Sequence, residues 1–211
     1  MKKLPPVAAP VGHRRPRVLP AAFFGQPALR VARGLLGMWL VRRRAGRETA
    51  YLITEVEAYD GPHDRASHAS RGLTARNAPM FGPPGRWYVY LCYGMHWMLN
   101  VVTGPSGYPA AVLIRGVAGA SGPGRVAKLL KVTRTQNGRL ARPATGLWIE
   151  DRGTLPRHGA VARAPRIGVD YAGAWAGKPY RFFLRGRVVV ALAAPSRAGG
   201  RPPRRRVAVC S

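Results

Sequence analysis

The sequence is poor in acidic residues and in cysteine. Only 8 of its 211 residues are Asp or Glu, against 35 Lys or Arg, which gives a formal net charge of +27. Cys92 and Cys210 are too few for a disulfide framework or a four-cysteine zinc site, so we expect reduced thiols and Cys92 as a core residue. Because so many like charges repel one another, the composition indicates a polyanionic partner, nucleic acid before an acidic membrane.

Long apolar segments and the common motifs for metals and nucleotides are also absent. No apolar run approaches the roughly 20 residues that span a bilayer. The basic N-terminus lacks the apolar stretch of a secretion signal, which predicts a cytoplasmic protein. No H-E-x-x-H, C-x-x-C, EF-hand, Walker or Rossmann pattern occurs, so we expect no metal and no cofactor. No lysine lies between Lys3 and Lys128, which disfavours a covalent lysine nucleophile in that region.

The remaining composition fits one globular domain with basic ends. Hydrophobic residues make up 46% of the chain, enough to build a core. Residues 1–17 and 195–211 are rich in Pro and Arg and indicate a flexible arm and a flexible tail, with the domain over residues 18–194. These ends would either attract phosphates or only keep the protein in solution.

Hydrophobic spacing predicts two helices and many short strands. Apolar residues recur at helical spacing over 26–37, where Gly37 would end the helix, and Gly-Pro-Gly precedes a basic amphipathic helix over 122–132. Residues 60–85 predict a long loop-rich stretch. The strands are expected at 38–42, 50–59, 87–93, 98–102, 110–117, 147–150, 167–169, 181–184 and 187–192. The pattern predicts an α+β fold, a single domain built on a curved antiparallel β-sheet with a few flanking helices.

Five of the eight acidic residues fall between positions 48 and 64, beside the loop-rich stretch. Strand alternation would place Ile53, Glu55, Glu57 and Tyr59 on one face, opposite a core face that carries Val56 and its neighbours Leu52 and Ala58. Nearby cations are expected to keep these carboxylates ionised, and a carboxylate in a cationic cleft suits a general base that activates water. Simple pairing of Glu55 and Glu57 with the abundant arginines would explain the same pattern.

A cluster of tyrosines follows the loop-rich stretch. Tyr88 and Tyr90 share one face of an expected strand, and Tyr93 lies at the turn Tyr93-Gly94-Met95. An aromatic side chain that projects from a basic surface can wedge between stacked bases. Ordinary core packing is the alternative explanation for these tyrosines.

These strings closely resemble the alkyladenine (3-methyladenine) DNA glycosylase family, also called methylpurine glycosylases. The similarity covers about residues 20–190, including TEVEAYDGPHDRASHASRG (54–72), PGRWYVYLCYGMHWMLNVV (84–102), AAVLIRG (110–116) and RIGVDYAGAWAGKPYRFFLRG (166–186). It implies a monomeric base-excision-repair enzyme, nucleoid-associated in a bacterium, that binds double-stranded DNA containing damaged purines. Such an enzyme flips out alkylated or deaminated purines (3-methyladenine, 7-methylguanine, hypoxanthine, ethenoadenine) and hydrolyses the N-glycosidic bond, without lyase activity, metal or cofactor.

The resemblance implies two residues at the reacting bond. Glu57 matches the general base that activates water, and Arg115 matches an arginine that helps to hold this glutamate and its water. After Arg115 the family commonly continues with an acidic residue and proline, whereas this chain has Gly116-Val117-Ala118-Gly119. The departure puts the rim of the pocket in question.

Five further residues match the part of the family's site that holds the base and the DNA. Tyr59 and Tyr90 match the aromatic residues that sandwich the flipped base, and His68 matches the third wall. Asn100 matches the residue that crowds the 2-amino group of normal guanine, and Tyr93 matches the side chain that fills the gap in the duplex. An electron-rich pocket of this kind would favour cationic alkylated purines by cation–π contact.

Two alternatives to an enzyme fit part of these observations. A non-catalytic basic nucleic-acid-binding protein explains the charge and the basic ends. A damage-binding relative of the family, without turnover, explains the motifs as well.

Overall fold

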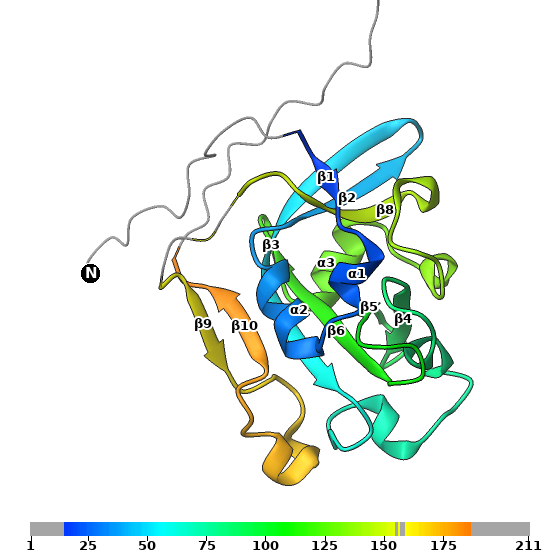
Figure 1. The fold of residues 1–211 in the computed structure, drawn as a ribbon, viewed down its shortest axis with the longest axis vertical. Helices are drawn as coiled ribbons and strands as arrows, with labels where there is room; N and C mark the ends of the chain where they lie inside the picture. The colour runs from blue at the N-terminus through cyan, green and yellow to red at the C-terminus, as the bar shows by residue number, and fades with distance from the viewer. Residues whose placement is uncertain (1–14, 155, 157–158, 187–211) are drawn as a thin grey trace, which may run out of the picture.

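The computed structural model describes residues 15–154, 156 and 159–186 (Figure 1). Within these residues, ten strands form one sheet whose pairings are all antiparallel. The strands are β1 (Arg17–Val18), β2 (Trp39–Arg44), β3 (Arg47–Asp60), β4 (Trp87–Cys92), β5 (His96–Val102), β6 (Ala110–Val117), β7 (Ala120–Ser121), β8 (Leu147–Asp151), β9 (Val161–Ala164) and β10 (Arg181–Leu184). Few helices flank the sheet, which confirms the predicted α+β architecture.

The helices are short and lie between the strands in sequence. They are α1 (Ala21–Phe24), α2 (Ala28–Leu35), α3 (Pro123–Leu129) and the 3-10 helices η1 (His68–Arg71), η2 (Ala78–Phe81), η3 (Arg134–Gln136), η4 (Pro143–Thr145) and η5 (Asp170–Trp175). Figure 1 shows α1 and α2 in front of the sheet and the paired strands β9 and β10 at its edge. No helix in the described part of the chain is long and apolar enough to cross a membrane.

Strand β3 is the centre of the sheet. Its first half pairs with β2, and its second half lies between β6 and β10. The order of the main strands is β1-β8-β2-β3-β6-β5-β4. Because the side chains of alternate residues point to opposite faces, each strand contributes residues to both faces of the sheet. One face carries the main core, with Val56, Val89, Val101 and Val112 among its buried residues.

Helix α2 covers the core face because its apolar residues recur at helical spacing. Ala28, Val31 and Leu35 are fully buried, and the helix packs on β3. Leu36 caps the end of the helix, and Gly37 has φ +85°. A Cβ atom at position 37 would lie only 2.8 Å from the carbonyl oxygen of Thr154. A side chain at position 37 would be strained in conformation and would clash. The predicted stop at this glycine is confirmed.

Most of the predicted elements are present, and one is wrong. Residues 167–169 form no strand: Gly168 has φ +75°, and the segment turns directly into η5. The short strands β1, β7 and β9 were not predicted, since two to four residues carry too little periodicity. The strand expected at 187–192 and the tail at 195–211 lie outside the described residues. So does the arm at 1–17, except for residues 15–17.

The predicted faces of β3 need one correction. Ile53 does not share a face with the two glutamates but is fully buried in the main core together with Val56. The pairing of β3 with β6 shifts register on both sides of Glu55, between Ile53 and Glu55 and again between Glu55 and Val56. Such an irregularity turns the strand and breaks strict alternation.

Candidate active site

The face of the sheet opposite the main core carries a cavity of about 420 Å³. A single cross-strand row places Tyr88, Asn100, Leu113 and Glu57 side by side on β4, β5, β6 and β3. The cavity has the size of ordinary small-molecule pockets. The structure brings all seven predicted site residues into its lining: Glu57, Tyr59, His68, Tyr90, Tyr93, Asn100 and Arg115.

Glu57 is a fully buried carboxylate with three polar neighbours. The Ile167 amide donates to its Oε1 at 3.0 Å, and the Tyr59 hydroxyl donates to its Oε2 at 3.0 Å. The Nη1 atom of Arg115 lies 3.6 Å from Oε1. Burial raises the pKa of Glu57 and outweighs the lowering by Ile167, Arg115 and Tyr59. The expected lowering of this pKa by a nearby cation is present, from Arg115, but burial outweighs it.

Glu55 and Glu57 differ in how they use the arginines. Glu55 accepts hydrogen bonds from Arg115 Nε and Arg181 Nη1, both at 3.0 Å. Pairing with arginine therefore explains Glu55. Glu57 lines the cavity, and Arg115 is fixed between the two carboxylates. An arginine held in this way can orient Glu57 without neutralising it in a close bidentate pair.

Aromatic rings form the walls of the cavity. The rings of His68 and Tyr90 are 4.6 Å apart, and Tyr88 lies 5.2 Å from Tyr90. His68 Nδ1 is 2.8 Å from the Tyr88 hydroxyl. Burial, with Arg76 nearby, lowers the pKa of His68, so its imidazole is neutral at pH 7. Tyr88 is buried and supports the wall of the cavity. Strand alternation alone did not distinguish this role from ordinary core packing.

Both tyrosine walls already contact a guanidinium group. Arg166 lies 4.8 Å from the centre of the Tyr59 ring, and Arg76 lies 5.1 Å from the centre of the Tyr90 ring. These faces are therefore less electron-rich toward a bound base than the sequence alone indicates.

Asn100 and Tyr93 both line the cavity but differ in exposure. Asn100 is buried at 3% exposure, and its Nδ2 donates to the Tyr88 carbonyl at 3.1 Å. Tyr93 is 90% exposed at the tip of the β4–β5 hairpin, with φ +48°, a left-handed conformation that is rare outside glycine. The hairpin thus presents an aromatic ring to the outside beside the mouth of the cavity.

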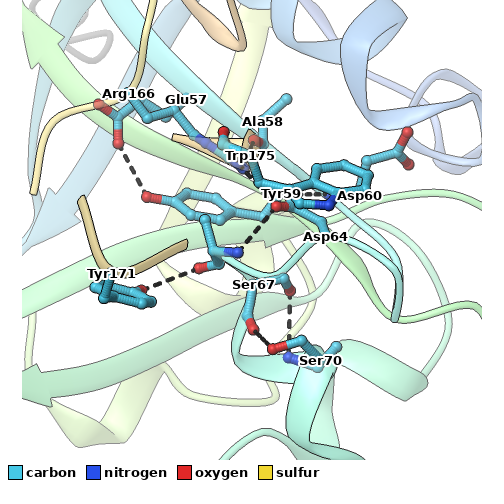
Figure 2. A network of polar contacts seen from close by, with 12 residues as sticks. Glu57, Ala58, Tyr59, Asp60, Asp64, Ser67, Ser70, Arg166, Tyr171 and Trp175 are labelled. Atoms are coloured by element: carbon cyan, nitrogen blue, oxygen red, sulfur yellow. Dashed lines mark hydrogen bonds and ion pairs between the residues drawn. The ribbon is translucent and has the colours of Figure 1, made fainter. Parts of the chain in front are cut away.

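A buried ion pair between Asp64 and Arg166 lies beside Tyr59 in a network of polar contacts (Figure 2). Asp64 and Arg166 are fully buried and form two hydrogen bonds, at 2.5 and 2.8 Å. Arg166 also donates to the Ala58 carbonyl at 2.8 Å, and the next residue, Ile167, supplies the amide that contacts Glu57. The pair therefore joins β3, the loop that carries His68 and the segment that starts at Arg166.

Sequence reasoning missed this pair and the Ile167 amide. Asp64 stood out only as one of five clustered acids, and no spacing connected it with Arg166, which lies 102 residues later. A backbone amide leaves no signal in the choice of side chain. Cys92 was also misplaced: it is partly exposed and lines the cavity instead of the core, because it ends β4 where the sheet meets the hairpin. Cys210 lies outside the described residues.

Among the described residues, no three His, Cys, Asp or Glu side chains come together in a group that could hold a metal ion. The lining includes aromatic rings, the Glu57 carboxylate, the Asn100 amide and two guanidinium groups, beside apolar side chains such as Met80 and Leu113. It offers hydrogen bonds and stacking to a ligand. This arrangement suits a planar aromatic ligand that presents a reactive atom to Glu57.

Comparison with known proteins identifies the family. A family model described as methylpurine-DNA glycosylase (MPG) matches residues 22–120 and 117–188. A protein of Myxococcus xanthus is 49% identical over 177 residues, which are 79% of this chain and 90% of that protein. A protein of Anaeromyxobacter dehalogenans (strain 2CP-1) is 45% identical over 190 residues, 87% and 90% of the two chains. A third, from Methanocella arvoryzae, is 43% identical over 198 residues, 84% and 98%. Each of the three carries the name "Putative 3-methyladenine DNA glycosylase". The chain belongs to the methylpurine-DNA glycosylase family.

Proposed function

We propose that this protein is a monofunctional DNA glycosylase that removes alkylated or deaminated purines from double-stranded DNA. The observation that carries the proposal is the position of Glu57, a buried carboxylate in the lining of an aromatic cavity. Membership of the methylpurine-DNA glycosylase family and the names of the relatives support the reaction class. The net charge of +27 supports a polyanionic substrate.

The reaction begins with extrusion of the damaged nucleotide, because its glycosidic bond cannot be reached inside the duplex. The flipped base lies between Tyr59 on one side and Tyr90 with His68 on the other. Tyr93 fills the space that the base leaves and offsets part of the unstacking cost, about 1–3 kcal/mol per stacked base.

Hydrolysis then uses Glu57 and one water. The water oxygen attacks the anomeric carbon of the sugar, the bond from that carbon to the purine nitrogen breaks, and Glu57 accepts the proton from the water. The bonding electrons leave with the base. A cationic alkylated purine departs as a neutral molecule, whereas a neutral lesion must gain a proton. Glu57 and Arg115 stay in place, and the ionised carboxylate stabilises positive charge that develops on the sugar. The product is an abasic site in an unbroken strand.

The test is a single-turnover assay with enzyme in excess over a duplex that holds one 7-methylguanine or one hypoxanthine. We expect free base and an alkali-labile but uncut strand. Lesion-specific binding without free base would identify a damage-binding protein instead. Equal binding to damaged and undamaged duplexes, with no free base, would identify a general nucleic-acid-binding protein that acts only through its positive charge.

Replacing Tyr93 by serine is expected to weaken binding to a lesion duplex by about tenfold, since one stacking contact worth about 1–3 kcal/mol is lost. Binding to the undamaged duplex should change much less, because its bases remain stacked. Fluorescence anisotropy with the inactive Glu57→Gln background measures both affinities at a fixed salt concentration. Equal losses on the two duplexes would reduce Tyr93 to a general DNA contact.

Replacing Asn100 by serine is expected to raise the release of normal guanine by about tenfold. Asn100 is buried against the row of cavity residues, so a shorter side chain opens space where the 2-amino group of guanine would otherwise clash. Hypoxanthine lacks that amino group, and its release from a matched duplex serves as the internal control. An unchanged guanine rate would remove Asn100 from base selection.

A further inference from the structure

The charged side chains around the cavity are mostly cationic. Within the described residues, the lining contains the carboxylate of Glu57 and the guanidinium groups of Arg76 and Arg115. Glu55 lies just outside and is already shared by Arg115 and Arg181. His68 adds no positive charge at pH 7, since burial and Arg76 lower its pKa. A ligand therefore enters a cavity whose own charge sums to about +1, counting one carboxylate against two arginines.

Arg76 is the cation placed directly against a wall that would hold the base. Its guanidinium lies 5.1 Å from the centre of the Tyr90 ring, and its Nη2 donates to the Leu91 carbonyl at 2.9 Å. The hydrogen bond keeps the group beside the ring. Asn77, the next residue, fixes the turn by donating to the carbonyls of His68 and Gly72. The charge is therefore positioned by the fold, although the side chain is exposed.

The opposite wall also contacts a guanidinium group, but the charge of that group is balanced. Arg166 lies 4.8 Å from the centre of the Tyr59 ring, but Asp64 balances its charge in the buried ion pair. For Arg76 the contacts in the described part of the chain are a ring and a carbonyl, neither of which neutralises it. Of these two guanidinium groups, Arg76 thus contributes the larger uncompensated charge near the base.

This charge acts differently on the two kinds of damaged purine. A cationic base, such as 7-methylguanine, is repelled by Arg76 and competes with it for the electron-rich face of Tyr90. A neutral base, such as hypoxanthine, loses little by lying next to the same arginine. DNA that covers the mouth of the cavity excludes water and strengthens the difference.

We propose that Arg76 is a specificity-determining residue that disfavours cationic purines, so that the cavity prefers neutral damaged purines of the same size. The inference rests on the proposed function and adds to it a preference between the two kinds of damaged purine. It runs against the simple expectation that an aromatic cavity favours cationic bases.

The test compares single-turnover release of 7-methylguanine and hypoxanthine from otherwise identical duplexes at pH 7.5. Arg76→Gln should raise the ratio of the 7-methylguanine rate to the hypoxanthine rate by about three- to tenfold, the size expected for one charge at this range. Arg76→Lys keeps the charge and should retain the wild-type ratio. Arg65→Gln removes the same charge from an exposed position on the same loop, outside the cavity lining, and should also retain it.

Three results would overturn the inference. An unchanged ratio in Arg76→Gln, with both rates altered equally, would make Arg76 a DNA contact without selectivity. An equal shift in Arg65→Gln would assign the effect to overall charge. An Arg76→Lys ratio equal to that of Arg76→Gln would exclude charge as the cause. If the wild-type protein releases neither base, the proposed function fails and the inference fails with it, which separates that case from the other three.

Discussion

Replacing Glu57 by glutamine is expected to lower the rate of base release at least 100-fold, while binding to lesion DNA is retained. General-base catalysis is typically worth about 10²–10⁴ in rate, and an amide cannot accept the proton from water. The side-chain shape is preserved, so the cavity remains able to hold a base. Single-turnover release from a 7-methylguanine duplex and anisotropy binding to the same duplex measure the two properties. Release at the wild-type rate would remove Glu57 from the mechanism.

The same variant should be no less stable than the wild-type protein at neutral pH. The pKa of Glu57 is raised in the folded state, so ionisation at neutral pH costs folding free energy that is absent below its unfolded pKa. Glutamine can still accept from the Ile167 amide and carries no charge to desolvate. Chemical denaturation at pH 7.5 checks this, with Glu48→Gln, an exposed glutamate, as the matched control for the lost charge.

The pH profile of the wild-type enzyme offers an independent check on Glu57. The base must be ionised to act, and its raised pKa means that the rate falls, on acidification, at a higher pH than the ordinary glutamate value of 4.5 would give. The 7-methylguanine duplex is the substrate to use, because departure of this base needs no proton. An acid limb at or below the ordinary value would contradict the assignment.

Replacing Asp64 by asparagine is expected to lower the free energy of unfolding by about 3–5 kcal/mol, because it leaves the buried Arg166 cation without its counterion. Chemical denaturation measures the loss. The same denaturation applied to Glu48→Gln gives the control, since Glu48 and Arg43 form an exposed pair at 2.6 Å that is worth at most about 1 kcal/mol.

A double variant separates the charge from the packing. Asp64→Asn combined with Arg166→Met removes both charges, and we expect it to recover much of the loss, since a paired charge is costly mainly when its partner alone is removed. If Asp64→Asn lowers the free energy of unfolding no more than Glu48→Gln does, the buried pair stabilises the fold no more than the exposed pair.

Patterns within short stretches of sequence predicted the elements and the members of the cavity. Alternation and helical spacing found α2 and the strands that carry Tyr90, Asn100 and Arg115, since periodicity reflects which face is buried. The family motifs gathered seven residues that do line one cavity. Their individual roles in catalysis and base selection stay predictions.

Features that depend on distant contacts could not be predicted. The pKa of Glu57 follows from burial by several segments, and the arginines on Tyr59 and Tyr90 come from two different loops. The register shifts around Glu55 depend on the partner strand β6 and leave no trace in β3 itself. In each case the missing information was which remote group lies next to a recognised residue.

The amide that holds Glu57 comes from a residue 110 positions later in the chain. During translation, Glu57 and Tyr59 leave the ribosome long before Arg166 and Ile167 are made. A nascent chain therefore contains the carboxylate without the groups that orient it, and contacts between such distant positions form slowly. A chain that stops before residue 166 lacks the Ile167 amide, the Arg166 partner of Asp64 and strand β10, so neither Glu57 nor the core would have its full set of contacts.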